Sequence, residues 1–403
     1  MRLRTILLAL ACAAAILAPA AGPAAVPRQF VLSPEGNHLW AYDSKTREHQ
    51  LVIRAQNGKN PGEAPPPGSA RRDINGQICV APDGRHIISG EDTVIPPPGG
   101  GGSSHDPRIA GWGYHEIAGS ALGSITVTQV GKLAPEAGVG PGYTGDPDNY
   151  GCGFLDGNRL VTTAIGDTLP GQPANGQLFL WFGPFDAGFR QETEPSGVKF
   201  FVGEVPHCQI DDTLATAGGI AVDDNGDVYV ATNRPDGLTP SGIWRFRGQF
   251  PSSMAECTPA FLAANVHKKL IIPHLKPLLF DLRSPTPSSV VVSPDDTLFV
   301  SSVFTGTVSE YTKAGNWVRD IFPLSPVTPP AGPTGNTPFG LAVTADGALW
   351  IADLGIVLSM PVGGQGSLIR IKFNPNRDPN LPAKTVRDGL TFPDGLGVYT
   401  PAP

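Results

Sequence analysis

In GIAVDDNGDVYVAT, residues 219–232, two apolar runs flank a turn rich in Asp, Asn and Gly. Apolar residues on both sides of tight-turn residues predict a β-hairpin. The same pattern returns as GLAVTADGALWIAD at residues 340–353. Three more copies align with these two, at residues 77–90, 151–164 and 289–302. Five such hairpins in one chain predict a repeat architecture made of β-strands.

Most of these hairpins are followed by further strand-like segments. The predicted third strands begin with Gly and are apolar, and they lie at residues 176–181, 242–246, 306–311 and 366–371. The predicted fourth strands lie at residues 199–202, 317–321 and 385–387. The copies begin roughly 50 to 75 residues apart, which exceeds the ~40–50 residues of a bare four-stranded blade. We therefore expect loop insertions at about residues 93–116, 134–149 and 250–286.

The two ends of the chain supply a sixth unit. Residues 392–399 have the pattern of a first strand, and residues 29–33, 39–43 and 50–53 have the pattern of the second, third and fourth. The sequence therefore predicts an all-β fold, a six-bladed β-propeller closed by the N- and C-terminal strands, as a single domain over residues 29–400. Closure of this kind removes free sheet edges. A pair of β-sandwiches or a β-helix is the alternative.

Composition narrows the class of protein. The chain has 50 Gly and 43 Pro, which disfavours long helices. Only 16% of residues are charged, the formal net charge is −7, and no run of Lys or Arg occurs. Nucleic acid and anionic membrane surfaces are therefore excluded as expected partners. We expect a monomer that takes a small-molecule substrate or an extracellular ligand.

The first 25 residues have the pattern of a cleaved signal peptide. Arg2 and Arg4 precede an apolar run at residues 6–17, and Ala18 and Ala20 offer a cleavage site. That run is short for a bilayer span, which needs about 20 residues, and no second run of this kind follows. The sequence therefore predicts a secreted or periplasmic protein without a membrane span.

Four cysteines follow the predicted signal peptide, and an even number in an exported protein indicates two disulfides. Four cysteines allow three pairings. We prefer the pairing that joins neighbouring repeats, which is Cys79 with Cys152 and Cys208 with Cys257.

A candidate site follows from the repeat alignment, because a propeller gathers the starts of its innermost strands at one mouth of the central channel. The position just before these strands holds Gly76, Tyr150, Gly218, Ser288, Phe339 and Asp394. The position before that includes Asn75 and Asn149. One carboxylate, Asp394, with the amide oxygens of Asn75 and Asn149 suits Ca²⁺. Both residue types, Asp and Asn, also form turns, so a purely structural role is the alternative.

Two further residues are candidate general bases. Glu91 precedes an insert rich in Pro, Gly and Ser at residues 96–104, which leads to His115 in a predicted loop. A loop that carries His and carboxylate side chains near the channel mouth suits proton transfer in hydrolysis. An ordinary surface loop is the alternative. The predicted catalytic residues are thus Asp394, His115 and Glu91.

The repeats at residues 219–232 and 340–353, with FPDGL at residues 392–396, resemble the six-bladed propellers of the gluconolactonase/regucalcin superfamily, of the senescence-marker-protein type, and the related NHL-repeat proteins. The resemblance implies that Asp394 binds Ca²⁺ and acts as a base, with Asn75 or Asn149 as a further ligand. In the repeat alignment, both asparagines lie one position before the position that Asp394 occupies. The family's Glu-Gly-Pro motif has no match at residues 29–36.

The resemblance leads to two expected functions. The first is a metal-dependent hydrolase of a lactone or small ester. The second is a non-catalytic, NHL-like secreted binding propeller. A redox or lyase propeller is a weaker third interpretation, because no cofactor motif supports it.

Overall fold

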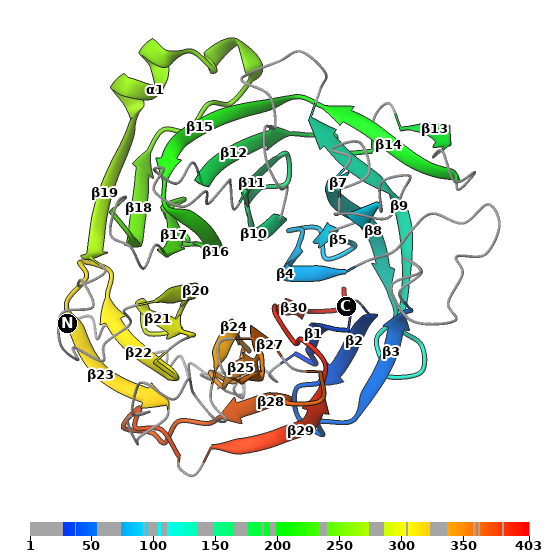
Figure 1. Cartoon of the computed structure of the whole chain (residues 1–403), viewed down its shortest axis with the longest axis vertical. Coiled ribbons are helices and arrows are strands. Elements are labelled where there is room, and N and C mark those ends of the chain that lie inside the picture. Colours follow the sequence, from blue (N-terminus) through cyan, green and yellow to red (C-terminus); the bar gives the residue numbers. More distant parts are fainter. Residues whose placement is uncertain are drawn as a thin grey trace, which may run out of the picture.

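The computed structural model describes residues 27–36, 38–54, 74–91, 94–95, 104–105, 111–135, 149–164, 176–186, 189–193, 199–233, 240–273, 286–303, 305–322, 337–357, 360–361, 363–380 and 383–402. Six sheets stand around a central axis, each with one strand innermost and the others successively farther out (Figure 1). The predicted fold, an all-β six-bladed propeller, is confirmed. Residues 1–26, which hold the predicted signal peptide, lie outside the described residues.

The first three blades contain the following strands, in order from the axis outward. Blade 1 contains β30 (Gly397–Tyr399), β1 (Phe30–Glu35), β2 (His38–Asp43) and β3 (His49–Ile53). Blade 2 contains β4 (Asn75–Val80), β5 (His86–Glu91), β8 (Gly111–Ala118) and β9 (Thr126–Pro135). Blade 3 contains β10 (Asn149–Asp156), β11 (Arg159–Ala164), β12 (Gly176–Phe182) and β15 (His207–Leu214).

The other three blades follow the same order. Blade 4 contains β16 (Thr216–Val222), β17 (Val228–Asn233), β18 (Gly242–Gly248) and β19 (Val266–Pro273). Blade 5 contains β20 (Pro287–Val292), β21 (Thr297–Ser302), β22 (Thr307–Thr312) and β23 (Trp317–Phe322). Blade 6 contains β24 (Pro338–Val343), β25 (Leu349–Asp353), β28 (Gly366–Ile371) and β29 (Lys384–Leu390). Two short pairs are β6 (Val94–Ile95) with β7 (Ser104–His105) and β26 (Ile356–Val357) with β27 (Met360–Pro361).

The five predicted hairpins form the inner two strands of blades 2 to 6, and their turns use the predicted chemistry. In blade 4 the Asp223 carboxylate accepts hydrogen bonds from the N–H groups of Asn225, at 2.9 Å, and Asp227, at 3.0 Å. Such a side chain fixes the backbone of the turn that follows it.

The ring closes as the sequence predicts. The C-terminal strand β30 pairs antiparallel with the N-terminal strand β1, with Phe30 opposite Tyr399 and Leu32 opposite Gly397. The Gln29 side chain donates a hydrogen bond to Thr400 Oγ1 at 2.9 Å. Both chain ends therefore belong to blade 1, and the innermost strand of that blade comes from the far end of the chain.

One predicted fourth strand is wrong. The segment at 199–202 lies in β14 (Lys199–Val205), which pairs parallel with β9 of blade 2 instead of completing blade 3. A sixth strand, β13 (Arg190–Thr193), pairs with the outer edge of β14, so blade 2 is a six-stranded sheet. The fourth strand of blade 3 is β15. Because β14 has the apolar pattern of any outer strand, its sequence does not reveal which sheet it joins.

Two predicted insertions are shorter than expected. Residues 111–116, placed in the insertion at 93–116, belong to β8. The insertion at 250–286 holds the 3₁₀ helix η1 (Met254–Glu256), the helix α1 (Pro259–Asn265) and β19, the outermost strand of blade 4. Most of the insertion at 134–149 lies outside the described residues. In the described part of the chain, no helix has the length and apolarity of a membrane span.

The apolar core lies between neighbouring blades rather than at the axis. Trp112 of blade 2 and Trp181 of blade 3 are fully buried in one cluster, and Trp181 Nε1 donates a hydrogen bond to Thr162 Oγ1 at 2.8 Å. The disulfide Cys79–Cys152 joins the inner strands of the same two blades. The disulfide Cys208–Cys257 joins β15 to the segment that follows β18. The preferred pairing of the four cysteines is therefore confirmed.

A buried polar cluster links blade 1 to blade 6. The Glu35 carboxylate accepts a hydrogen bond from Tyr42 Oη at 2.5 Å and one from Arg387 Nη1 at 3.0 Å. Arg387 lies in β29, and its guanidinium also stacks over the Trp40 ring at 4.3 Å. Burial raises the pKa of Glu35 to about 7, against the lowering effects of Tyr42 and Arg387.

This pKa predicts a pH dependence of stability. The folded chain holds the Glu35 proton more tightly than the unfolded chain, so its contribution is full below about pH 4.5 and is lost as the pH rises through about 7. We expect the Glu35→Gln variant to lack this loss, which is about 3 kcal/mol. Urea unfolding of both proteins at pH 4.5 and 8 measures it. An identical pH dependence in the variant would contradict the assignment.

Candidate functional site

The two ends of the central axis differ. We call the end at which the innermost strands begin the start mouth, and the end at which they run into the hairpin turns the turn mouth. The residues that precede the innermost strands in the sequence alignment meet at the start mouth. Gly395 lies against the carbonyl oxygen of Gly76, Gly218 lies against that of Ser288, and Gly340 lies against that of Asp394. The predicted convergence of these positions is therefore present.

Tyr150 crosses the axis at the start mouth. Its Oη donates a 2.5 Å hydrogen bond to the carbonyl oxygen of Asp394 in the segment before β30, and its ring meets the Phe339 ring edge-on at 4.9 Å between centroids. Blade 3 carries Tyr150, whereas blades 1 and 6 carry its two partners. Burial, and then the charge of Asp394, raises the pKa of Tyr150 well above its usual value, so the phenol stays neutral.

Asn75 and Asp394 lie on the two neighbouring chain segments at this mouth, and both side chains are half-buried. The Asn75 Oδ1 atom is itself buried and has no hydrogen-bond partner among the described residues. An amide oxygen left in this state costs free energy unless a cation, a water or a ligand meets it. Asn149 begins β10 on the adjacent blade, but its side chain lies outside the described residues.

The oxygen atoms at the start mouth are of the types that bind a hard cation. Asn75 supplies an amide oxygen and Asp394 a carboxylate, which are the ligands that Ca²⁺ takes, with water or carbonyl oxygens in its remaining positions. No group of three or more His, Cys, Asp or Glu side chains within the described ranges is placed to share a metal ion. A cation here would therefore be held by amide and backbone oxygens beside one carboxylate.

His115 does not lie where the sequence predicts. It belongs to β8, the third strand of blade 2, and its side chain is fully buried, with Nε2 3.0 Å from Ser89 Oγ. The segment that holds it also carries Trp112 and Tyr114, which pack into the core instead of covering the channel mouth. Gly111 and Gly113 interrupt the apolar pattern, so the sequence does not reveal this strand. Glu91 ends β5, and its side chain lies outside the described residues.

The ends of the second strands hold two polar residues at the start-mouth end of the blades. Asn233 Oδ1 and Asp353 Oδ2 are buried and have no hydrogen-bond partner within the described part of the chain. The other oxygen of Asp353 accepts hydrogen bonds from Thr337 N at 3.0 Å and from Thr337 Oγ1 at 2.7 Å. Burial raises the pKa of Asp353. Asp353 thus positions the chain that enters β24.

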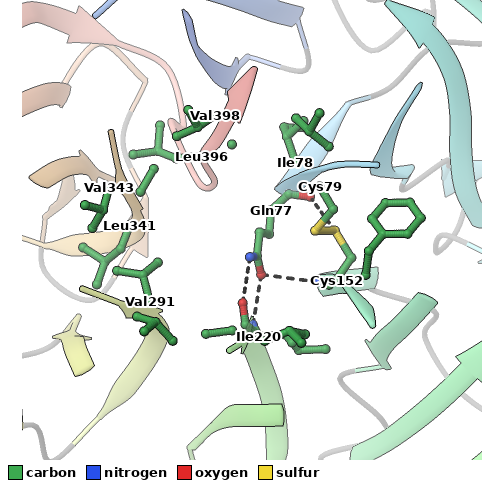
Figure 2. Close-up of a pocket in the computed structure, with 18 of the residues that line it drawn as sticks. Gln77, Ile78, Cys79, Cys152, Ile220, Val291, Leu341, Val343, Leu396 and Val398 are labelled. Carbon is green, nitrogen blue, oxygen red and sulfur yellow. Dashed lines mark hydrogen bonds between the residues drawn. A yellow bond between two sulfur atoms is a disulfide. The ribbon is translucent and has the colours of Figure 1, made fainter. Parts of the chain in front are cut away.

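Gln77 is a site residue that sequence reasoning missed. Its side chain reaches from blade 2 past blade 3 to blade 4, where Nε2 donates to the carbonyl oxygen of Ile220 at 2.8 Å and Oε1 accepts from Ile220 N–H at 2.9 Å (Figure 2). The same Oε1 accepts from Cys152 N–H at 3.4 Å. A polar residue at the first position of an apolar strand was the available signal, since the other repeats have Gly or Ser there.

A cavity of about 380 Å³ lies on the turn-mouth side of Gln77. All six innermost strands line it, and Figure 2 shows Ile220, Leu341 and Leu396 on different sides of it. The axis therefore has two different regions. Tyr150 crosses the start mouth, whereas an open cavity lined by apolar side chains lies on the turn-mouth side.

No protein-family model and no curated protein matches this chain. Among solved structures, it is similar to a chain of a nidogen–laminin complex (10% identity, TM-score 0.48, 93% of this chain and 100% of that chain). It is similar to a periplasmic gluconolactonase of Pseudomonas aeruginosa (12%, 0.45, 93% and 100%). It is also similar to regucalcin, a calcium-binding protein of Agrobacterium tumefaciens (9%, 0.43, 79% and 75%). The structures similar to this chain thus include propellers of the gluconolactonase and regucalcin type.

Proposed function

We propose that the protein is an exported hydrolase of a lactone or small ester, and that its site is the start mouth around Asp394 and Asn75. The observation that supports this most is the buried Asn75 Oδ1, which has no hydrogen-bond donor among the described residues and lies beside the segment that carries Asp394. The resemblance of residues 392–396 to the gluconolactonase strand start supports the same assignment. The two disulfides suit an oxidising compartment, outside the cell or in the periplasm.

In this proposal, residues of this chain hold the cation, position the site and transfer a proton. Ca²⁺ bound at these oxygens would polarise the substrate carbonyl. Asn75 Oδ1 and the Asp394 carboxylate would hold the cation, and Tyr150 fixes the backbone of Asp394. Asp394 would accept a proton from the attacking water while the new C–O bond forms. When the ring C–O bond breaks, that proton passes to the leaving oxygen, and the product is a hydroxy acid.

A direct experiment tests the proposal. The purified protein is assayed by elemental analysis and against a panel of lactones and small esters, with and without a calcium chelator. We expect about one calcium per chain and a turnover that chelation removes and added calcium restores. A folded protein that is metal-free and inert across the panel would exclude the hydrolase.

The Asp394→Asn variant gives a sharper expectation. Removing the only carboxylate proposed for the site removes both the charge that holds the cation and the base, so kcat/KM should fall about 100-fold. Asp378→Asn is the matched control, because Asp378 is exposed and pairs with Arg319 at the outer edge of the blades. The control should keep full activity, and equal activity of both variants would remove Asp394 from the site.

The second candidate is a binding propeller without catalysis. The observation that favours it is the open cavity on the turn-mouth side, whose apolar side chains offer a ligand surface but which has no titratable side chain among its described lining residues. The two functions differ in one readout, because a binder shows ligand affinity without chelator-sensitive turnover.

A further inference from the structure

A ring of six apolar side chains surrounds the axis near the turn mouth. Each comes from the same register position of an innermost strand, three residues after the glycine, serine or glutamine that begins the shared pattern. The ring consists of Val80, Phe154, Val222, Val292, Val343 and Val398, and all six line the 380 Å³ cavity. None is fully buried. Partly exposed apolar side chains that gather around one cavity indicate a ligand surface rather than a core.

The other side chains that line this cavity are also apolar, although backbone N–H and C=O groups contribute to its exposed surface as well. Gln77, whose amide is engaged by Ile220 and Cys152, is the one polar side chain among the described lining residues. The disulfide Cys79–Cys152 forms part of the wall (Figure 2). The apolar side chains offer contact surface, and a volume of about 380 Å³ suits a hydrocarbon or aromatic group.

The rim of the cavity is acidic. A second hollow of about 560 Å³ opens beside it and shares Val222, Val292 and Val343 with it. Three carboxylates line this hollow, those of Asp223, Asp224 and Asp296. Lys313 makes ion pairs with Asp223, at 2.7 Å, and with Asp296. Lys313 therefore compensates Asp223 and Asp296, whereas Asp224 forms no ion pair within the described residues.

We propose that the turn-mouth cavity binds a small amphiphile with a cationic head, whose apolar part enters the ring of six side chains and whose head lies beside Asp224. The apolar part supplies the free energy, at about 25 cal/mol per Å² of surface removed from water. The acidic rim selects the sign of the head and contributes less, because exposed charge pairs are worth up to about 1 kcal/mol. This site is separate from the proposed hydrolase site, and the two lie at opposite ends of the axis.

Three probes of equal chain length test the proposal on the full folded protein. Decyltrimethylammonium and decyl sulfate are titrated below their micellar concentrations and decanol below its solubility limit, all at low salt, and binding is followed by calorimetry. We expect saturable one-site binding in the order cation, alcohol, anion. Absence of saturable binding for all three probes would overturn the proposal, and equal binding of the cation and the anion would overturn the assignment of the head.

Variants then locate the site. Val222→Phe and Val343→Phe extend a ring into the cavity from blades 4 and 6, and each should weaken binding of all three probes at least tenfold. Val318→Phe is the control, because Val318 is 43% exposed on the outermost strand of blade 5, and it should change nothing. Unchanged binding in a folded cavity variant, confirmed by its thermal unfolding, would overturn the site. Two positions in different blades guard against the failure of one variant to fold.

Asp224→Asn tests the head without touching the cavity. Asp224 is exposed in a hairpin turn, so the variant should fold normally and should bind the cation about two- to fivefold more weakly while binding decanol as before. This difference should vanish at high salt. A parallel change for both probes would overturn the contact with the head. Binding should persist in Asp394→Asn, so failure of the hydrolase proposal and failure of this one are told apart.

Discussion

Replacing Gly395 with alanine is expected to destabilise the protein by at least about 3 kcal/mol, because the added methyl group has no space. A Cβ at Gly395 would overlap the carbonyl oxygen and carbon of Gly76, which belong to the backbone of the neighbouring inner strand. Backbone cannot turn aside as a flexible side chain can. Either β4 and β30 must separate or the closing strand must shift, and both movements break the ring at its join.

The measurement is urea unfolding followed by tryptophan fluorescence. Gly157→Ala is the matched control, since a Cβ at that glycine in the β10–β11 turn meets nothing within 4 Å. The control should stay within about 0.5 kcal/mol of the wild type. Because Asp394 precedes Gly395, a shift of β30 should also lower any activity of the start mouth. A stable Gly395→Ala protein would mean that the inner strands do not approach one another this closely.

Removing the Cys79–Cys152 disulfide is expected to lower the free energy of unfolding by as much as the Gly395→Ala substitution, or more. The two cysteines are separated by 73 positions in sequence. Loop-closure entropy for a loop of this length corresponds to about 4 kcal/mol at 25 °C, because the cross-link restricts the unfolded chain. Both side chains are buried between blades 2 and 3, so alanine at each site should leave the outer strands in place. We expect the Cys79→Ala/Cys152→Ala variant to unfold at a clearly lower urea concentration.

Counting reactive thiols distinguishes the loss of the cross-link from a loss of side-chain packing at the two cysteines. The denatured, unreduced wild-type protein should show no reactive thiol among Cys79, Cys152, Cys208 and Cys257, and the single variant Cys79→Ala should show one. A loss below about 1 kcal/mol in the double variant, with reactive thiols at both positions in the wild type, would exclude the pairing. The double variant also removes part of the cavity wall, so its affinity for the decyl probes reports on that wall independently of stability.

The local sequence pattern was sufficient to predict the elements that depend only on nearby residues. Residues 219–232 and 340–353 form hairpins because apolar alternation and the Asp-Gly turn agree, and each hairpin needs only its own neighbours. The alignment of these copies also identified the positions before the inner strands, including Asp394 and Tyr150, that meet at the start mouth. The sixth blade followed from counting, since the two chain ends held complementary parts of one unit.

Long-range partners were not readable in the same way. The strand at 199–205 has an ordinary outer-strand pattern, and only its packing decides that it joins blade 2. Glycines interrupt the strand of His115 in the sequence, whereas β5 on one side and β9 on the other hold it in the sheet. The sequence shows Gln77 as a polar residue in an apolar strand but not its partner, because Ile220 is 143 positions away.

The five hairpins, their turns, the number of blades and the candidate disulfides could be predicted from the sequence, because they depend on periodicity, turn chemistry and counting. Which side chains cross the axis, which strand completes which blade, and where the axis holds a cavity became visible in the folded ring alone. These features arise between residues that ring closure brings together, so a residue such as Tyr150 or Gln77 acquires its role from partners on other blades.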